Sequence, residues 1–428
     1  MPDQRKKYTN TTLNFISRNR KVLSGKSAGR NLYMKTLIKL YENRSIENVI
    51  AAETFRPEQI IYLCPAEELP GASMRKSLKA HFAARGLQVK LLFKETSIYK
   101  ADKILKQLKK LTAQYPDCAV DITGGTDAAL FAAGMLSSER GTPAFTFSRK
   151  QNRFYNILNA PFAEDRICTL NYSVEDYFRI AGGRMRPGRV DNQMLSRHLR
   201  EFDGFFSVYL RWKREWTDAV VFFQRISQQN EGKPVSLTVS GDSVQKGDHG
   251  KKVTAPAEML RELAELGFLL DLDLSEPKRV SFRFADEQVR FWLRDIGSVL
   301  ELYIYKACLD ADIFHDVVSS AVVDWDSEDS SRAVTNEIDA VAGRGTLPVF
   351  ISCKTCEIKT EALNELAILR DRFGGKGAKA VAVTSERCGS AARHRAAQLQ
   401  IAVIDREELE QGKAAARLRV IMKIDDIL

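Results

Sequence analysis

Two short runs in the last third of the chain bring together residue types that could cleave a phosphodiester bond. The run TNEID ends at Asp339, and the apolar run VFISCKT contains Ser352 and Lys354. If both runs are strands, their period of two puts Glu337 with Asp339 on one face, and Ser352 with Lys354 on one face of the next strand. An aspartate that faces a lysine across a hairpin can hold Mg²⁺ or Mn²⁺, while the lysine positions or helps to deprotonate the nucleophile. A cross-strand ion pair is the structural alternative.

Further acidic residues flank these two runs. Glu301 lies in the helical segment before them, and Glu361 and Glu365 stand one turn apart in the helical segment after them. The order of a Glu-bearing helix, an Asp strand, a Ser-x-Lys strand, a helix and a strand resembles the PD-(D/E)xK nuclease fold. In the usual pattern of that superfamily, a second metal-binding carboxylate occupies the position of Ser352. Some of its restriction enzymes have Ser-x-Lys and take this acid from the following helix, so the resemblance implies Glu365, and after it Glu361, as the replacement.

A second set of residues, in the run DITGGT at 121–126, could bind a ligand. Its two glycines let the backbone approach a ligand closely, and the helix that follows presents free amides to phosphate. A double glycine capped by threonine also begins many helices that bind nothing. The run is no P-loop, because the lysine of that motif is absent and Asp127 comes next. The candidate ligand-binding residues are Thr123, Gly124, Gly125 and Thr126, together with Ser17, Arg18 and Asn19 at the end of the first predicted strand.

The first 170 residues alternate between two patterns that would position this run. Apolar runs predict strands at 12–17, 59–64, 88–93, 118–123 and 143–148. Apolar residues that recur at spacings of three and four predict helices at 28–51, 73–86 and 97–114. This alternation predicts a doubly wound α/β sheet, in which ligands bind at the carboxyl ends of the strands.

The middle of the chain is predicted to be mostly helical. Helices are expected at 172–183 and 193–226, and a polar loop at 240–252. Residues 256–284 predict a helix, two strands and a tight turn, an order that resembles a winged helix able to read DNA. A spacer between two domains is the alternative, because the glutamates at 258, 262 and 265 in this helix would repel phosphate.

The last third predicts the elements that carry Asp339 and Lys354. Helices are expected at 297–311 and 360–373, and strands at 322–327, 335–342, 347–355, 378–385 and 401–406. The run AGRGTL between the second and third of these strands predicts a hairpin turn. This order would bring the Asp strand and the Ser-x-Lys strand side by side.

The amino-acid composition indicates which kind of partner and which cellular location to expect. A net charge of +10 and a pI near 9.1 favour a polyanionic partner, and the first thirty residues carry eight Lys or Arg against one Asp. Seven scattered cysteines are typical of reduced cytosolic thiols, and the start of the chain lacks the apolar core of a secretory signal. The longest apolar run, 128–136, is too short for a membrane span. We therefore expect a cytoplasmic protein.

Together these runs resemble the CRISPR-associated Rossmann-fold (CARF) sensor nucleases, in which a CARF domain is fused to a PD-(D/E)xK-like domain. The resemblance is carried by DITGGT at 121–126, NYSVEDYFRIAGG at 171–183, NEIDAVA at 336–342, and FISCKT at 350–355 with NELAILRDRFGG at 364–375. It implies an α/β protein of three parts. These are a Rossmann-like CARF domain at 1–170, a helical and winged-helix-like connecting region at 171–294, and a restriction-endonuclease-like domain at 295–428.

The resemblance also implies a function. The protein would be an allosterically activated, metal-dependent endonuclease of type III CRISPR antiviral defence that cleaves DNA, RNA or both. A homodimer would share a pocket for a cyclic oligoadenylate, with cyclic tetra-adenylate expected because its two-fold symmetry suits a two-fold interface. Binding would reposition nuclease domains in which Asp339 with Glu365 or Glu361 holds Mn²⁺ or Mg²⁺. The alternative is a ligand-sensing DNA-binding regulator whose nuclease domain is inactive because Ser352 replaces the acid.

Overall fold

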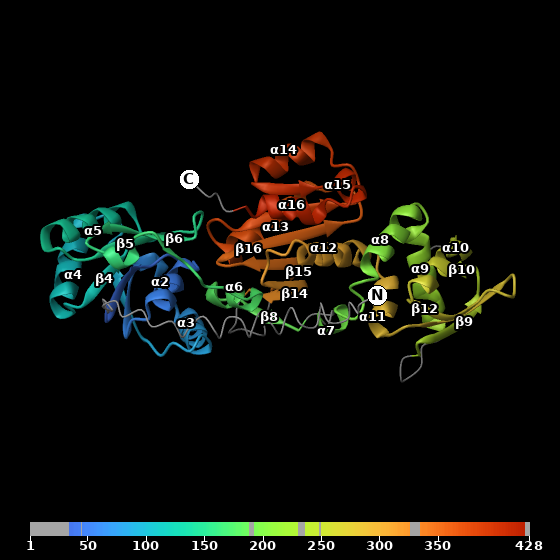
Figure 1. Ribbon diagram of the computed structural model, residues 1–428, viewed down its shortest axis with the longest axis horizontal. Helices are drawn as coiled ribbons and strands as arrows, with labels where there is room; N and C mark the ends of the chain where they lie inside the picture. Colours follow the sequence, from blue (N-terminus) through green and yellow to red (C-terminus); the bar gives the residue numbers. More distant parts are fainter. Residues whose placement is uncertain are drawn as a thin grey trace, which may run out of the picture. The chain divides into compact units, whose positions relative to one another are not determined.

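The computed structural model describes residues 34–43, 45–187, 192–229, 236–247, 250–325 and 334–423 (Figure 1). These residues form a mixed α/β fold with one large sheet near each end of the chain and two small sheets between them in sequence. The predicted fold class is therefore confirmed. Residues 17–19, which were expected to bind ligand, and the strand predicted at 12–17 lie outside the described residues.

The N-terminal sheet has seven strands in the order β3-β2-β1-β4-β5-β6-β7, of which β1 to β5 are parallel. Helices α2 and α3 pack on one face and α4 and α5 on the other, so two separate cores flank the sheet. The strands are β1 (Thr36–Leu40), β2 (Gln59–Pro65), β3 (Lys90–Thr96), β4 (Cys118–Asp121), β5 (Ala144–Ser148), β6 (Arg153–Leu158) and β7 (Arg166–Ile167). The helices are α2 (Glu47–Phe55), α3 (Ala72–Ala84), α4 (Ala101–Gln114) and α5 (Asp127–Arg140), with 3₁₀ turns η2 (Ala66–Glu68) and η3 (Pro161–Ala163).

The prediction of one helix over 28–51 is wrong for its middle part. Residues Thr36–Leu40 form β1, the central strand between β2 and β4, and only the end of the predicted segment is helical, as α2. All five residues of β1 are buried, with Leu37 in one core and Ile38 in the other. A strand that is buried on both faces shows no alternation of apolar and polar residues, so its apolar residues matched the helical spacing instead.

The connecting region contains more elements than its sequence predicted. The long helix expected at 193–226 is interrupted, and the segment forms α7 (Asn192–Leu195), α8 (Phe202–Arg211) and α9 (Trp216–Gln229). The loop expected at 240–252 contains β9 (Thr238–Asp242), β10 (Gln245–Lys246) and β11 (Lys252–Val253). The expected helix and two strands are present as α10 (Ala257–Glu265), β12 (Leu269–Asp273) and β13 (Arg279–Phe284), followed by α11 (Glu287–Leu293). Strand β9 was not predicted because its sequence is polar. Its strand conformation depends on pairing with β13.

The C-terminal sheet has six strands in the order β18-β17-β16-β15-β14-β8. Strands β8 (Arg184–Arg186), β14 (Asp316–Asp324), β15 (Thr335–Arg344) and β16 (Leu347–Lys354) are antiparallel neighbours, whereas β17 (Lys379–Thr384) and β18 (Ile401–Ile404) continue the sheet in parallel. A two-residue turn joins β15 to β16, as the hairpin prediction required. Strand β14 begins six residues before the predicted strand.

Helices cover both faces of this sheet. Helices α12 (Ser298–Asp310) and α16 (Ala414–Ile421) belong to one core, and α13 (Thr360–Gly374) and α14 (Ser390–Gln398) to the other, while α15 (Arg406–Glu410) follows β18. No helix among the described residues is both long and apolar enough to cross a membrane.

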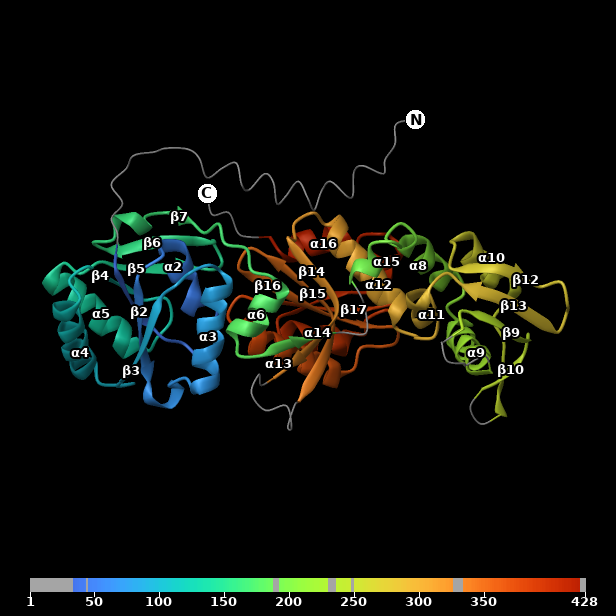
Figure 2. The ribbon, with the colours of Figure 1, turned by 90° about the horizontal axis from the view of Figure 1, so that it is seen from below.

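Helix α6 (Val174–Ile180) joins the two large sheets. It packs against α3 of the N-terminal part and against α13 of the C-terminal part (Figure 2). Tyr177 and Ile180 contribute to the core beneath α2 and α3, whereas Val174 and Phe178 contribute to the core beneath α13. One short helix therefore anchors itself in both halves of the protein.

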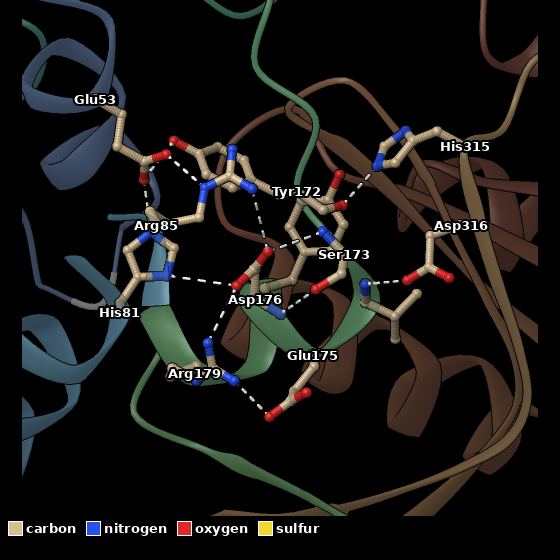
Figure 3. A network of polar contacts seen from close by, with 12 residues as sticks. Glu53, His81, Arg85, Tyr172, Ser173, Glu175, Asp176, Arg179, His315 and Asp316 are labelled. Carbon is tan, nitrogen blue, oxygen red and sulfur yellow. Dashed lines mark hydrogen bonds and ion pairs between the residues drawn. The ribbon is translucent and has the colours of Figure 1, made fainter. Parts of the chain in front are cut away.

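A buried charge network holds α6 against α3 (Figure 3). His81 is fully buried, with Nε2 2.6 Å from Glu53 Oε1 and Nδ1 3.5 Å from Asp176 Oδ1. Burial alone would lower the pKa of His81, but Asp176 and Glu53 outweigh burial and raise it. Burial alone would raise the pKa of Asp176, but contacts with His81 and Ser173 lower it to about 2. The raised pKa of His81 and the lowered pKa of Asp176 both favour the charged forms of this network.

The first turn of α6 is also held by the C-terminal part. Asp316 Oδ2 accepts a hydrogen bond of 2.7 Å from the backbone N of Val174, at the start of the helix (Figure 3). His315 Nε2 lies 2.7 Å from the carbonyl of Tyr172, and Gly345 N donates to His315 Nδ1 at 3.3 Å. Burial lowers the pKa of His315. A neutral imidazole that donates through Nε2 and accepts through Nδ1 satisfies both contacts.

Candidate active site and ligand turn

Asp339 of β15 meets three residues of β16 through one carboxylate oxygen. Asp339 Oδ2 accepts a hydrogen bond of 2.6 Å from the backbone N of Cys353 and one of 3.3 Å from the hydroxyl of Ser352. Lys354 Nζ lies 3.5 Å from the same oxygen. Within the described residues these contacts all end on Oδ2, which leaves the lone pairs of Oδ1 for another ligand. The hairpin therefore brings together the aspartate, serine and lysine that the sequence singled out.

The charge of Lys354 is fixed by this arrangement. Burial alone would lower the pKa of Lys354, but Asp339 outweighs burial and raises it. Lys354 is half-buried and remains a cation at neutral pH. It is suited to bind a phosphate oxygen or to orient a nucleophile rather than to accept a proton.

Glu301 of α12 belongs to the same electrostatic site. Burial, followed by the negative charges of Asp339, Asp295 and Glu337, raises the pKa of Glu301 to about 8, while Lys354 opposes the rise. Neighbouring carboxylates keep Glu301 partly protonated. This is typical of a site where negative charges are crowded. A divalent cation would relieve this crowding.

The strand opposite Asp339 is distorted. Ser320 of β14 has a φ of 50°, in the left-handed region that non-glycine residues rarely adopt, and the pairing of β14 with β15 is interrupted there. Beyond this point the faces of β15 exchange, since Ile338 belongs to the core under α13 and Ala340 to the core under α12. The distortion therefore lies opposite Asp339, where β15 departs from the regular strand pattern. No glycine at this position of the sequence predicted it.

Glu365 and Glu361 lie elsewhere on the domain. Glu365 Oε1 accepts a hydrogen bond of 2.8 Å from Asn336 Nδ2, and both glutamates line a pocket of about 450 Å³ next to Trp325. No contact within the described residues joins Glu365 or Glu361 to Asp339. Of the predicted acids, the structure therefore brings Glu301 to Asp339, and it places Glu365 and Glu361 in a separate pocket.

Two carboxylates could hold a metal ion at this site. Among the described residues no group of three or more His, Cys, Asp or Glu side chains is placed to bind one. Mg²⁺ and ions like it keep several waters and need only one or two protein carboxylates. Asp339 and Glu301 supply two such hard oxygen ligands, so the residues present fit this kind of ion.

The two glycines of DITGGT pack tightly against the end of β1. Gly124 and Gly125 have φ values of 84° and 88°. A Cβ on Gly124 would lie 2.8 Å from Glu42 Oε2, and a Cβ on Gly125 would lie 2.8 Å from Leu40 Cβ. Both backbone conformation and space therefore require glycine here, and Gly125 is exposed at the carboxyl edge of the sheet.

The two threonines hold this turn in shape. Thr123 Oγ1 accepts a hydrogen bond of 2.8 Å from the backbone N of Phe147. Thr126 caps α5, since its Oγ1 donates to the carbonyl of Ile98 at 3.0 Å and accepts from Ala129 N at 3.3 Å. Both hydroxyls thus have protein partners, so a ligand would meet the backbone of Gly124 and Gly125 first.

Two residues of this edge were missed in the sequence because one lies in β1 and the other just after it, and β1 was predicted to be helix. Lys39 is fully buried, its Nζ lies 3.2 Å from Asp121 Oδ2, and it donates to the carbonyl of Thr123. Glu42 follows β1 and lies beneath Gly124. Once β1 is recognised, its period of two identifies Lys39 as the residue beside Asp121.

The C-terminal part of the chain matches a known domain family. Residues 285–421 match the family model described as Card1-like, endonuclease domain. This range includes α12, β14, β15 and β16, and therefore Glu301, Asp339 and Lys354. This part of the chain is thus similar to the Card1-like endonuclease domain, as the predicted nuclease resemblance expected.

The fold is also similar to solved structures over most of the chain. Can2 from Sulfobacillus thermosulfidooxidans in complex with cyclic tetra-adenylate aligns with a TM-score of 0.67 and 16% identity, covering 91% of this chain and 98% of that chain. Protein VC1899 from Vibrio cholerae aligns with a TM-score of 0.69 and 17% identity, with the same coverages. Comparison with curated proteins found no match. At these identities the similarity shows a shared fold.

Proposed function

We propose that this protein is a type III CRISPR ancillary nuclease that a cyclic oligoadenylate activates and that cleaves DNA, RNA or both. The observation that carries the proposal is the contact of Asp339 with Ser352 and Lys354 inside the Card1-like endonuclease domain. The fold shared with Can2, which was solved with cyclic tetra-adenylate, supports a sensor at the other end of the chain. We place this function in the cytoplasm, as the cysteine content suggests.

In the nuclease domain, Asp339 and Glu301 would hold Mg²⁺ or Mn²⁺. The bound ion would supply a Lewis acid and a more acidic water at neutral pH. Ser352 and the backbone N of Cys353 fix the Asp339 carboxylate through hydrogen bonds. Lys354 stays charged and binds a non-bridging oxygen of the scissile phosphate, where negative charge grows in the transition state.

In the N-terminal domain, the ligand would be cyclic tetra-adenylate bound over the turn at 123–126. The amides of Gly124 and Gly125 and the start of α5 suit its phosphates. A homodimer would present two such turns to one two-fold symmetric ring. The homodimer and the ring size are both parts of this proposal.

The proposal is tested by cleavage of labelled single-stranded DNA, plasmid DNA and RNA in Mn²⁺, with and without cyclic tetra-adenylate. Cleavage should depend on the ligand and fall by at least about 100-fold in Lys354→Ala, because a charge-stabilising group is lost. Lys413→Ala, which removes an exposed lysine of the same domain, should cleave as the wild type does. A regulator with an inactive nuclease domain would show ligand-dependent, salt-sensitive DNA binding without cleavage.

A further inference from the structure

A loop of the nuclease domain lies next to the ligand turn of the sensor domain. Lys376, in the loop that follows α13, has its Nζ 2.6 Å from Glu42 Oε1. The other oxygen of that carboxylate, Oε2, lies 2.8 Å from where a Cβ on Gly124 would be. Glu42 thus stands between Gly124 and a lysine that belongs to the other domain.

Lys376 can readily exchange Glu42 for another anionic partner. The Lys376 side chain is 77% exposed, and exposed ion pairs are weak because solvent screens them. A hydrogen bond with Glu42, supported by the charges of Glu47 and Glu68, raises the pKa of Lys376, so the ammonium keeps its charge. A phosphate placed over Gly124 would compete with Glu42 for this ammonium through a charge-assisted hydrogen bond.

The ligand turn itself offers no such cation. Residues 121–129 contain no lysine or arginine, and α5 begins with Asp127. Lys39 is fully buried and bound to Asp121 and to the carbonyl of Thr123. Phosphates at this turn would therefore gain a mobile positive charge from Lys376.

A buried arginine connects the loop of Lys376 to the catalytic hairpin. Arg149, from the end of β5, donates to the carbonyl of Lys376, to that of Gly374 at 3.1 Å and to that of Thr346 at 3.0 Å. Its Nη1 also lies 3.4 Å from Glu47 Oε1 of α2. Thr346 belongs to the turn between β15 and β16, the two strands that carry Asp339 and Lys354. A shift of the Lys376 loop would therefore also displace this turn.

We propose that Lys376 is a ligand-binding residue that the nuclease domain contributes to the sensor site. A bound cyclic nucleotide takes the ammonium from Glu42, and Arg149 transmits the resulting shift of the loop to the turn between β15 and β16. The lysine makes this contact only when its loop has shifted, so the ligand binds the shifted state more tightly, which is the difference in free energy that allosteric coupling needs. This inference rests on the proposed binding of a cyclic oligoadenylate at the turn.

The test compares three variants of the full-length protein with the wild type. Fluorescent cyclic tetra-adenylate gives the Kd, and cleavage of labelled single-stranded DNA over a ligand titration gives the half-activating concentration and the maximal rate. Lys376→Gln should raise the Kd about tenfold, the equivalent of one charged contact, and should also lower the maximal rate at saturating ligand. Glu42→Gln should lower the Kd, because it removes the competitor for Lys376. Lys413→Gln, an exposed lysine of the nuclease domain, should match the wild type.

The outcomes separate this inference from the proposed function. If the wild type binds the ligand and is activated, but Lys376→Gln has the same Kd and the same activation curve, the role of Lys376 is overturned and the proposed function stands. A higher Kd in Glu42→Gln would also contradict the competition with Glu42. If the wild type binds no cyclic oligoadenylate, both the proposed function and this inference fail.

Discussion

The guanidinium of Arg149, in the N-terminal half, donates a hydrogen bond of 3.0 Å to the carbonyl of Thr346, in the turn between β15 and β16. The Arg149 side chain is only 5% exposed. The planar guanidinium of an arginine can donate hydrogen bonds to several carbonyls at once. A lysine ammonium cannot do this with the same geometry. Arg149 therefore connects the sheet that carries the turn at 123–126 with the sheet that carries Asp339.

Arg149→Lys should separate ligand binding from activation. The substitution keeps the positive charge near Glu47 but removes the fork that holds Thr346, Gly374 and Lys376. We expect the maximal cleavage rate at saturating ligand to fall about tenfold, equivalent to one coupling contact, with a smaller change in the Kd for cyclic tetra-adenylate. Ligand binding and cleavage measured on one preparation check this, and equal loss of both would show a merely structural role.

Glu301→Gln should stop cleavage while stabilising the metal-free protein. The variant removes a proposed metal ligand, so cleavage should fall at least about 100-fold. It also removes the repulsion from Asp339, Asp295 and Glu337, so the Tm measured at pH 9 in EDTA should rise.

Glu365→Gln is the matched control for this prediction, because Glu365 binds Asn336 and lines a separate pocket. It should retain cleavage in Mn²⁺. The reverse pattern, with activity lost in Glu365→Gln and retained in Glu301→Gln, would assign the second acid to α13.

Gly125→Ala should destabilise the sensor domain more than Gly141→Ala does. Both glycines have positive φ values, 88° and 65°, so both variants incur the left-handed strain of about 1–2 kcal/mol. Only at Gly125 would the new Cβ also meet a neighbour, Leu40 Cβ at 2.8 Å, whereas nothing lies within 4 Å of a Cβ at Gly141. Urea unfolding of both variants measures the difference, and equal free energies of unfolding would contradict the tight packing of the turn.

The His81 network predicts a pH-dependent stability. The pKa of His81 is raised in the folded state, so its stabilisation is complete below its unfolded pKa of about 6.5 and is lost as the pH rises through the folded pKa. The pKa of Asp176 is lowered to about 2, so its stabilisation is present above its unfolded pKa of about 4 and is lost as the pH falls toward 2.

His81→Gln should therefore lose the most stability between pH 4 and 6.5, by about 3 kcal/mol, because it removes the buried positive charge between the carboxylates of Glu53 and Asp176. Urea unfolding at pH 5.5, 7.5 and 9 measures this, with the exposed His394→Gln as control. A deficit that stays constant across this range would show that His81 contributes packing and no charge.

The sequence predicted best those features that depend on neighbours along the chain. The proximity of Asp339, Ser352 and Lys354 could be predicted because a short hairpin and a period of two place them together. The choice between Glu301 and Glu365 depends on which face of the sheet each helix covers, which no local pattern reports. Strand β1 was mistaken for helix because it is buried on both faces, and Glu42 was lost with it. Arg149 and Lys376 have no motif, since their partners lie about two hundred or more residues away in the chain.

The most direct test of the central claim is cleavage of labelled single-stranded DNA and RNA by the wild type and by Asp339→Asn, in Mn²⁺ with cyclic tetra-adenylate. The substitution keeps the size of the side chain and its hydrogen-bonding oxygen but removes the charge that would hold the metal. We predict ligand-dependent cleavage of at least one substrate by the wild type, and no detectable cleavage by the variant, which still binds the ligand with the wild-type Kd. No cleavage by the wild type with ligand present, or equal cleavage by Asp339→Asn, would contradict the proposed nuclease site.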